Sequence, residues 1–149
     1  MKKLTCSVAA LVFSLAVLPG AHGRDTKLML PISVALETKD AGEKLDGSVK
    51  FFFGDQKTPA VQKTFGNFIT NKKTNAVGKS DEKACNWAFL SAMVALEKRA
   101  QQLGANAVVN IVSYYQKNTM SSATEFECHA GAVIAGVALK GDFVTVADK

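Results

Sequence analysis

The clearest hydrophobic pattern in the chain lies between residues 80 and 104. Apolar side chains recur there at steps of three and four, which places them on one face of an α-helix. This stripe consists of Cys85, Phe89, Ala92, Met93, Leu96, Ala100 and Leu103. A second row, formed by Trp87, Leu90 and Val94, is expected to widen the buried face. The pattern therefore predicts a long, mostly covered helix over Asp81–Leu103.

Both ends of this helix are marked in the sequence. The hydroxyl of Ser80 is suited to accept a hydrogen bond from an early helical N–H group, so Ser80 is the expected N-cap. Asp81 and Glu82 follow it and place negative charge at the positive end of the helix dipole. Gly104 supplies the left-handed residue that commonly ends a helix, and no proline interrupts the run.

Segments rich in β-branched and aromatic residues predict strands around this helix. They are expected in the first part of 28–36, over 48–54, 62–74 and 107–115, in a long strand region at 123–139, and at 143–146. A helical turn is expected from Pro31, a loop or short frayed helix over 37–47, and a polar hairpin loop over 116–122. These elements predict the α+β class, with one main helix packed on a small mixed or antiparallel sheet.

The N-terminus has the pattern of a secretory signal peptide. Lys2 and Lys3 form a short basic region, residues 4–18 are apolar and uncharged, and small residues precede a cleavage site expected after Gly23. The apolar run is short for a retained transmembrane helix. We therefore expect residues 1–23 to be removed, residues 24–149 to form one domain without a membrane span, and the protein to be periplasmic or secreted.

Charge and cysteine content narrow the possible functions. Removal of Lys2 and Lys3 would lower the net charge from +5 to +3, and the remaining lysines are scattered, which argues against nucleic acid as a partner. Cys6 would leave with the signal peptide. In an oxidising compartment the two remaining cysteines, Cys85 and Cys128, predict a single disulfide. The strand that carries Cys128 is expected to pair with the strand that follows the helix.

No recognised catalytic motif occurs in the sequence. It lacks the phosphate-binding loop, the dinucleotide fingerprint, the His-Glu-x-x-His zinc motif and the Gly-x-Ser-x-Gly nucleophile motif. With reduced thiols, Cys85, Cys128 and His129 are candidate metal ligands, because thiolate and imidazole are the usual soft ligands. Tyr114 and Tyr115 are candidates for surface recognition, although we expect one of them to point inward from a strand. These observations predict a non-enzymatic protein with no cofactor.

Two stretches carry a resemblance to known proteins. The end of the predicted helix with Gly104-Ala105-Asn106-Ala107-Val108-Val109, together with Gly131-Ala132-Val133, resembles YbjQ-type domains and the periplasmic domain of the Rcs envelope-stress sensor lipoprotein. This resemblance covers roughly residues 64–141 and implies a helix packed on a small mixed sheet. Unlike that sensor, the chain has no lipidation cysteine and only one cysteine pair.

Over its whole predicted mature length the chain resembles exported bacterial proteins often labelled "excinuclease ATPase subunit". The matching stretches are Lys27-Leu28-Met29-Leu30-Pro31, residues 50–56 and Ser113-Tyr114-Tyr115. The residues do not support the activity in that label, because there is no ATPase loop and no zinc-finger cysteine spacing. We expect a small exported, non-enzymatic envelope protein that binds an envelope protein partner or senses the state of the envelope. The alternative is a metal- or redox-responsive module that uses Cys85, Cys128 and His129.

Overall fold

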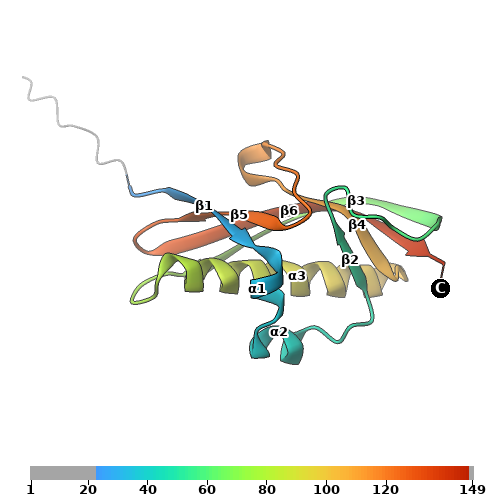
Figure 1. Ribbon diagram of the computed structural model, residues 1–149, viewed down its shortest axis with the longest axis horizontal. Helices are drawn as coiled ribbons and strands as arrows, with labels where there is room; N and C mark the ends of the chain where they lie inside the picture. Colours follow the sequence, from blue (N-terminus) through green and yellow to red (C-terminus); the bar gives the residue numbers. More distant parts are fainter. Residues whose placement is uncertain (1–22, 148–149) are drawn as a thin grey trace, which may run out of the picture.

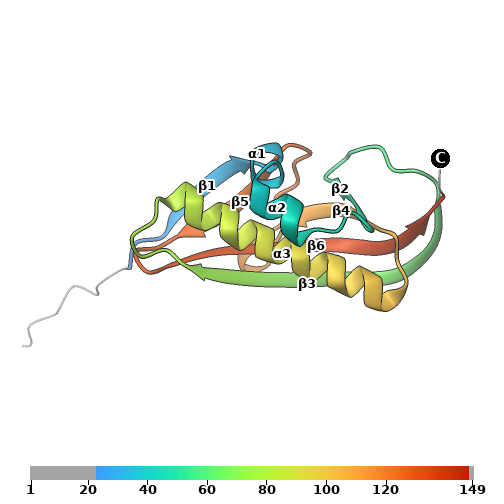
Figure 2. The same cartoon turned by 90° about the horizontal axis from the view of Figure 1, so that it is seen from below.

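A computed structural model describes residues 23–147, and in it one long helix lies along one face of a six-stranded mixed sheet (Figure 1). Residues 1–22 of the predicted signal peptide lie outside the described residues. In chain order the elements are β1 (Thr26–Pro31), α1 (Ile32–Leu36), α2 (Lys39–Lys44), β2 (Lys50–Phe53), β3 (Val61–Asn75), α3 (Asp81–Leu103), β4 (Ala107–Ser113), the 3-10 helix η1 (Tyr115–Lys117), β5 (Glu125–Ala130) and β6 (Ile134–Val146). Among the described residues, no helix is both long and apolar enough to cross a membrane. The α+β class is confirmed, although strands dominate the fold and the sheet is curled (Figure 2).

Helix α3 has the predicted bounds and the predicted caps. The side chain of Ser80 accepts a hydrogen bond from the backbone N–H of Lys83 at 3.2 Å. Gly104 ends the helix in the left-handed region with a φ of 74°. Here local sequence signals are sufficient, because both caps act within one turn of the helix.

The sheet is built around the 13-residue strand β6. Strand β3 pairs antiparallel with one edge of β6 along nearly its whole length, from Val61 opposite Val146 to Asn75 opposite Ile134. The other edge of β6 pairs antiparallel with β5 near its start and with β4 near its end. Strand β1 pairs antiparallel with β5, and β2 pairs parallel with β4. Because two strands share one edge of β6, the sheet is long and curled, and α3 runs across it (Figure 2).

The C-terminal half of the sheet differs from the sequence-based prediction. The long strand region expected over 123–139 is correct only in part, because a turn at residues 131–133 divides it into β5 and β6. The backbone N–H of Gly131 donates to the carbonyl of Ile134 at 2.8 Å and closes this turn. The separate strand expected at 143–146 is also wrong, since β6 continues to Val146 without a break.

The strand pairing of Cys128 was also predicted incorrectly. Its strand, β5, pairs with β1 and β6 and not with β4. Because β4 pairs with the second half of β6, the first half of that edge is free for β5. The predicted strand over 107–115 ends at Ser113, so Tyr114 and Tyr115 lie beyond it.

The main core lies between α3 and the sheet. The ring of Phe89 stacks on that of Phe126, with centroids 4.1 Å apart, and lies 6.1 Å from the ring of Phe53. A smaller apolar cluster lies apart from this core and consists of Phe52, Ala107, Val109, Val144 and Val146. The residues that alternate with these on β6, such as Val137 and Leu139, belong to the main core. Both faces of this sheet are therefore partly apolar.

Candidate functional site

The structure joins Cys85 and Cys128 in a disulfide, as predicted. Their sulfur atoms are 2.03 Å apart, their Cα atoms are 5.8 Å apart, and both residues are fully buried. The bond connects the first turns of α3 to the middle of β5. Because each sulfur is bonded to the other, neither is a thiolate able to bind a metal or attack a substrate.

His129 lies on the other face of the sheet, because successive residues of a strand point to opposite faces. Its Nδ1 is 2.9 Å from Oδ1 of Asp25, and its Nε2 is 2.8 Å from Oε1 of Glu127. Both ring nitrogens are therefore engaged by carboxylates. The structure therefore does not bring His129 together with the two cysteines. In the described part of the chain, no group of three or more His, Cys, Asp or Glu residues is placed to hold a metal ion.

The Glu127 carboxylate is buried between Lys27 and His129. Lys27 Nζ lies 2.9 Å from its Oε2, and His129 binds its Oε1. Burial of the carboxyl raises its pKa, but the hydrogen bonds from His129 and Lys27 outweigh burial and leave the pKa of Glu127 below its ordinary value. The ion pair between Lys27 and Glu127 links β1 to β5. This charged cluster was not predicted from the sequence, although Glu125, Glu127 and His129 alternate with apolar residues in a way that indicates one polar face of a strand.

The two tyrosines have separate roles, and neither points inward from a strand. The Tyr115 ring stacks on the His129 ring, with centroids 3.6 Å apart and planes at 8°. Tyr114 carries the ammonium group of Lys140 over its ring at 4.9 Å. Both tyrosines are half-buried.

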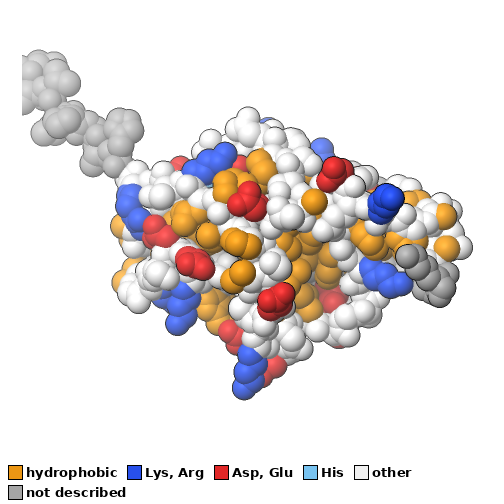
Figure 3. Space-filling model, viewed as in Figure 1, with side chains coloured by type: hydrophobic (Ala, Val, Ile, Leu, Met, Phe, Trp, Pro, Cys, Tyr) orange, Lys and Arg blue, Asp and Glu red, His pale blue; other side chains and the backbone are white. Residues whose placement is uncertain are grey.

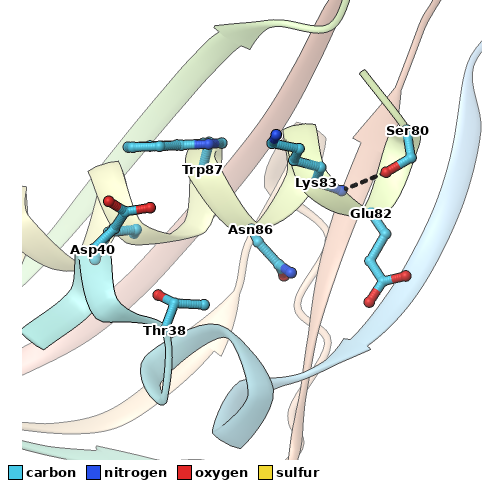
Figure 4. A pocket seen from close by; sticks show the side chains of 8 residues that line it. Thr38, Asp40, Ser80, Glu82, Lys83, Asn86 and Trp87 are labelled. Carbon is cyan, nitrogen blue, oxygen red and sulfur yellow. Dashed lines mark hydrogen bonds between the residues drawn. The ribbon is translucent and has the colours of Figure 1, made fainter.

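The outer face of α3 carries a groove that is centred on Trp87. A cavity of about 280 Å³ lies between α2 and the start of α3, where Asp40, Glu82 and Asn86 surround it together with Trp87 (Figure 4). A second cavity of about 320 Å³ continues along α3 toward β3. Both cavities are lined by Trp87 and Leu90, so they form two parts of one surface, here called the α3 groove.

The α3 groove has an apolar floor. Leu90 is only 3% exposed, as the hydrophobic pattern predicted. Trp87 and Val94, from the same predicted row, are only half-buried and line the groove. The expectation that this whole row is covered is therefore wrong. The reason is tertiary: α2 and β3 flank α3 on this side without closing over it (Figure 2).

The two ends of the α3 groove differ in charge. Asp40 and Glu82 line the first cavity, where Lys83 is the cationic neighbour. The charged side chains that line the second cavity are all cationic, and these are Lys44, Lys72 and Lys98. Lys44 Nζ also lies 5.8 Å from the centroid of the Trp87 ring. The surface therefore combines an aromatic centre, an acidic end and a basic end.

Glu97 is a buried carboxyl close to the C-terminal end of α3. It is 3% exposed, and its Oε2 accepts a hydrogen bond from the backbone N–H of Asp46 at 3.4 Å. Its Oε1 has no hydrogen-bond partner among residues 23–147. Burial raises the pKa of Glu97 above its ordinary value of 4.5, and the hydrogen bond from Asp46 only partly offsets this. The ionised form of Glu97 is therefore less favourable in the folded state than in the unfolded state.

Glu97→Gln is expected to increase stability at neutral pH. Because the pKa of Glu97 is higher in the folded state, the folded protein binds more protons, and its stability falls as pH rises from 4.5 through the folded pKa. Three other carboxyls, those of Asp46, Asp81 and Glu127, have pKa values that are lowered in the folded state. Their contribution to stability is therefore lost as pH falls, which is the opposite pH dependence to that of Glu97. Urea unfolding at several pH values should show the difference between variant and wild type growing with pH. Glu43→Gln, at an exposed site, is the control, and an equal gain there would contradict the assignment.

Comparison with protein-family models, with curated proteins and with solved structures found no significant match. The resemblance to exported proteins and to the Rcs sensor domain therefore remains an expectation from the residues.

Proposed function

We propose that the protein is a small exported, non-enzymatic envelope protein that binds a polypeptide partner in the α3 groove. Export is supported by the signal-peptide pattern at the N-terminus and by the Cys85–Cys128 disulfide, because disulfides persist mainly in oxidising compartments. A binding role is supported by the groove. Cationic and anionic side chains are interspersed over the face in Figure 3, which favours a polypeptide partner over a uniformly charged one.

The position of Trp87 carries the proposal. It is the only tryptophan of the chain, and it lies half-buried between two cavities on an otherwise covered helix. Tryptophan is enriched among the residues that dominate binding energy, because its large ring loses much water contact when a partner covers it. A tryptophan required only for the core would be expected among the buried residues of α3.

The charges beside Trp87 define the partner's chemistry. A segment with an apolar or aromatic centre would cover Trp87, Leu90 and Val94. Basic side chains at one end would face Asp40 and Glu82, and acidic side chains at the other would face the three lysines. Such complementary charges orient a ligand and increase its rate of association more than they increase affinity.

A catalytic or metal-responsive role has less support. Both nitrogens of His129 are engaged by carboxylates, and both cysteine sulfurs are fully buried in their disulfide. These are the residues that the alternative requires to be free. The buried disulfide is better suited to holding α3 on the sheet.

Selection from a library of random short peptides tests the proposal. Selected peptides are expected to share an apolar or aromatic centre with basic residues on one side and acidic residues on the other. Their binding can be followed by intrinsic fluorescence, because the only tryptophan lies in the groove. Trp87→Ala, followed by calorimetry, is expected to weaken binding about 30-fold, which corresponds to roughly 2 kcal/mol for a central interface residue.

Tyr114→Ala is the matched control. Like Trp87, Tyr114 is a half-buried aromatic residue with a lysine ammonium over its ring, but it follows β4 and packs beside β6. We expect this variant to bind the selected peptides normally. Equal losses in both variants, or peptides without the dipolar pattern, would contradict the proposed site.

A further inference from the structure

One end of the domain brings together the start of the described chain and two turns. These are residues 23–25, the turn at 131–133 between β5 and β6, and residues 76–80 before α3, at the left in Figure 1. The backbone N–H of Ala76 donates to the carbonyl of Val133 at 2.8 Å. Arg24 donates to the carbonyl of Gly131 at 2.8 Å and pairs with Asp81 at 2.7 Å. We call this interconnected end the proximal tip.

Exposed aliphatic side chains gather at the proximal tip. Val77 is 58% exposed, Val133 is 60% exposed and Ile134 is 51% exposed. Single exposed apolar residues are common on protein surfaces, but neighbouring ones often indicate an interaction site. Val77 follows Ala76, whose backbone is hydrogen-bonded to Val133, so the three side chains belong to adjacent segments.

Cationic groups lie next to these aliphatic side chains. A cavity of about 470 Å³ is lined by Val133 and Ile134 together with Lys73, Arg24 and Asp25. The carboxylate of Asp25 is engaged by His129. The charge of Arg24 is balanced by Asp81, whereas Lys73 makes no ion pair within residues 23–147. Lys79 contributes a second cation on the turn before α3. Apolar side chains beside cationic ones are the combination that binds anionic membrane surfaces.

The position of the predicted signal peptide indicates which surface this end meets. The predicted peptide ends at Gly23, and Gly23 lines the same cavity as Lys73 and Val133. A chain exported by that peptide would therefore be attached to the membrane at its proximal tip until cleavage. The exposed aliphatic residues would then be the part of the folded domain nearest to the lipid.

We propose that the proximal tip is a membrane-contact surface for anionic phospholipid. Val77, Val133 and Ile134 enter the headgroup region, and Lys73 and Lys79 bind lipid phosphates. The contact is reversible, because it involves few side chains. It is independent of peptide binding in the α3 groove, so Trp87→Ala is expected to leave it unchanged.

The test uses the processed protein, purified after export, and lipid vesicles. We expect the protein to sediment with vesicles that contain phosphatidylglycerol, to sediment at least tenfold less with pure phosphatidylcholine vesicles, and to dissociate as salt increases. The double substitution Val133→Ser and Ile134→Ser should reduce binding at least tenfold. Lys73→Gln should reduce it severalfold and weaken its dependence on salt.

Ile69→Ser is the matched control, because Ile69 is 57% exposed on β3 outside the proximal tip. Thermal unfolding of each variant verifies that it is folded. The proposal is overturned if the wild type binds neither kind of vesicle, or if Ile69→Ser loses as much binding as the tip variants. It is also overturned if the protein binds inorganic phosphate but no vesicles, or if sedimentation velocity shows that the aliphatic residues instead join two copies of the chain.

Discussion

Reduction of the Cys85–Cys128 disulfide is expected to lower the free energy of unfolding by about 4 kcal/mol. The two cysteines are separated by 43 residues, and closing a loop of that length removes much conformational freedom from the unfolded chain. A domain of this size has a total stability of only about 5–15 kcal/mol. The melting temperature should therefore fall by roughly 15 °C. Urea unfolding of the oxidised protein and of the same protein reduced with dithiothreitol would measure the change.

The double variant Cys85→Ala and Cys128→Ala separates the effect of the bond from that of the reductant. Its stability is expected to lie near that of the reduced wild type and to be insensitive to dithiothreitol. Thiol counting must show that the buried bond is fully reduced in the wild-type sample. If the fully reduced protein kept its original stability, the disulfide would not be a major stabilising element.

The elements that were predictable from the sequence depend on local interactions. Helix α3 was predicted at both ends because Ser80 and Gly104 act on backbone groups within one turn. The Cys85–Cys128 pair was predictable for a different reason. Only two cysteines remain outside the predicted signal peptide, so an oxidising compartment leaves a single pairing.

The strand order was not predictable in the same way, because it depends on residues far apart in the chain. Gly131 and Gly141 illustrate the difficulty. Gly131 closes the turn between β5 and β6, whereas Gly141 lies inside β6, where an added Cβ would lie 2.7 Å from Val108 Cγ1. The same residue type thus permits a turn in one place and close packing of two strands in the other, and only the neighbouring strands distinguish them.

The candidate sites also combine features set by local sequence with features set by residues far apart in the chain. The sequence placed Trp87 in the correct helix, but whether it is covered depends on where α2 and β3 lie. The contact of His129 with Asp25 depends on the register between β1 and β5, because Asp25 comes directly before β1. Neither relation has a local signal. A polar face of β5 was readable from its alternation, but its partners were not.

Phe89→Ala is expected to lower the free energy of unfolding by about 3–5 kcal/mol, the usual cost of deleting a large buried aromatic side chain. Phe89 is fully buried on α3, and it packs between Phe126 of β5 and Phe53 of β2. The substitution leaves a cavity where α3 crosses both halves of the sheet. Urea unfolding under oxidising conditions, with the disulfide intact, would measure this contribution separately from that of the bond.

Phe65→Ala is the matched control, because it removes the same atoms at a half-buried site on β3. Its expected cost is smaller, since water can occupy much of the vacated space. A double-mutant cycle of Phe89 and Phe126 should give a coupling energy of about 0.5–1.5 kcal/mol for the stacked rings. Equal costs for Phe89→Ala and Phe65→Ala would contradict the assignment of Phe89 to the centre of the core. In that case the disulfide, and not aromatic packing, would be the main connection between α3 and the sheet.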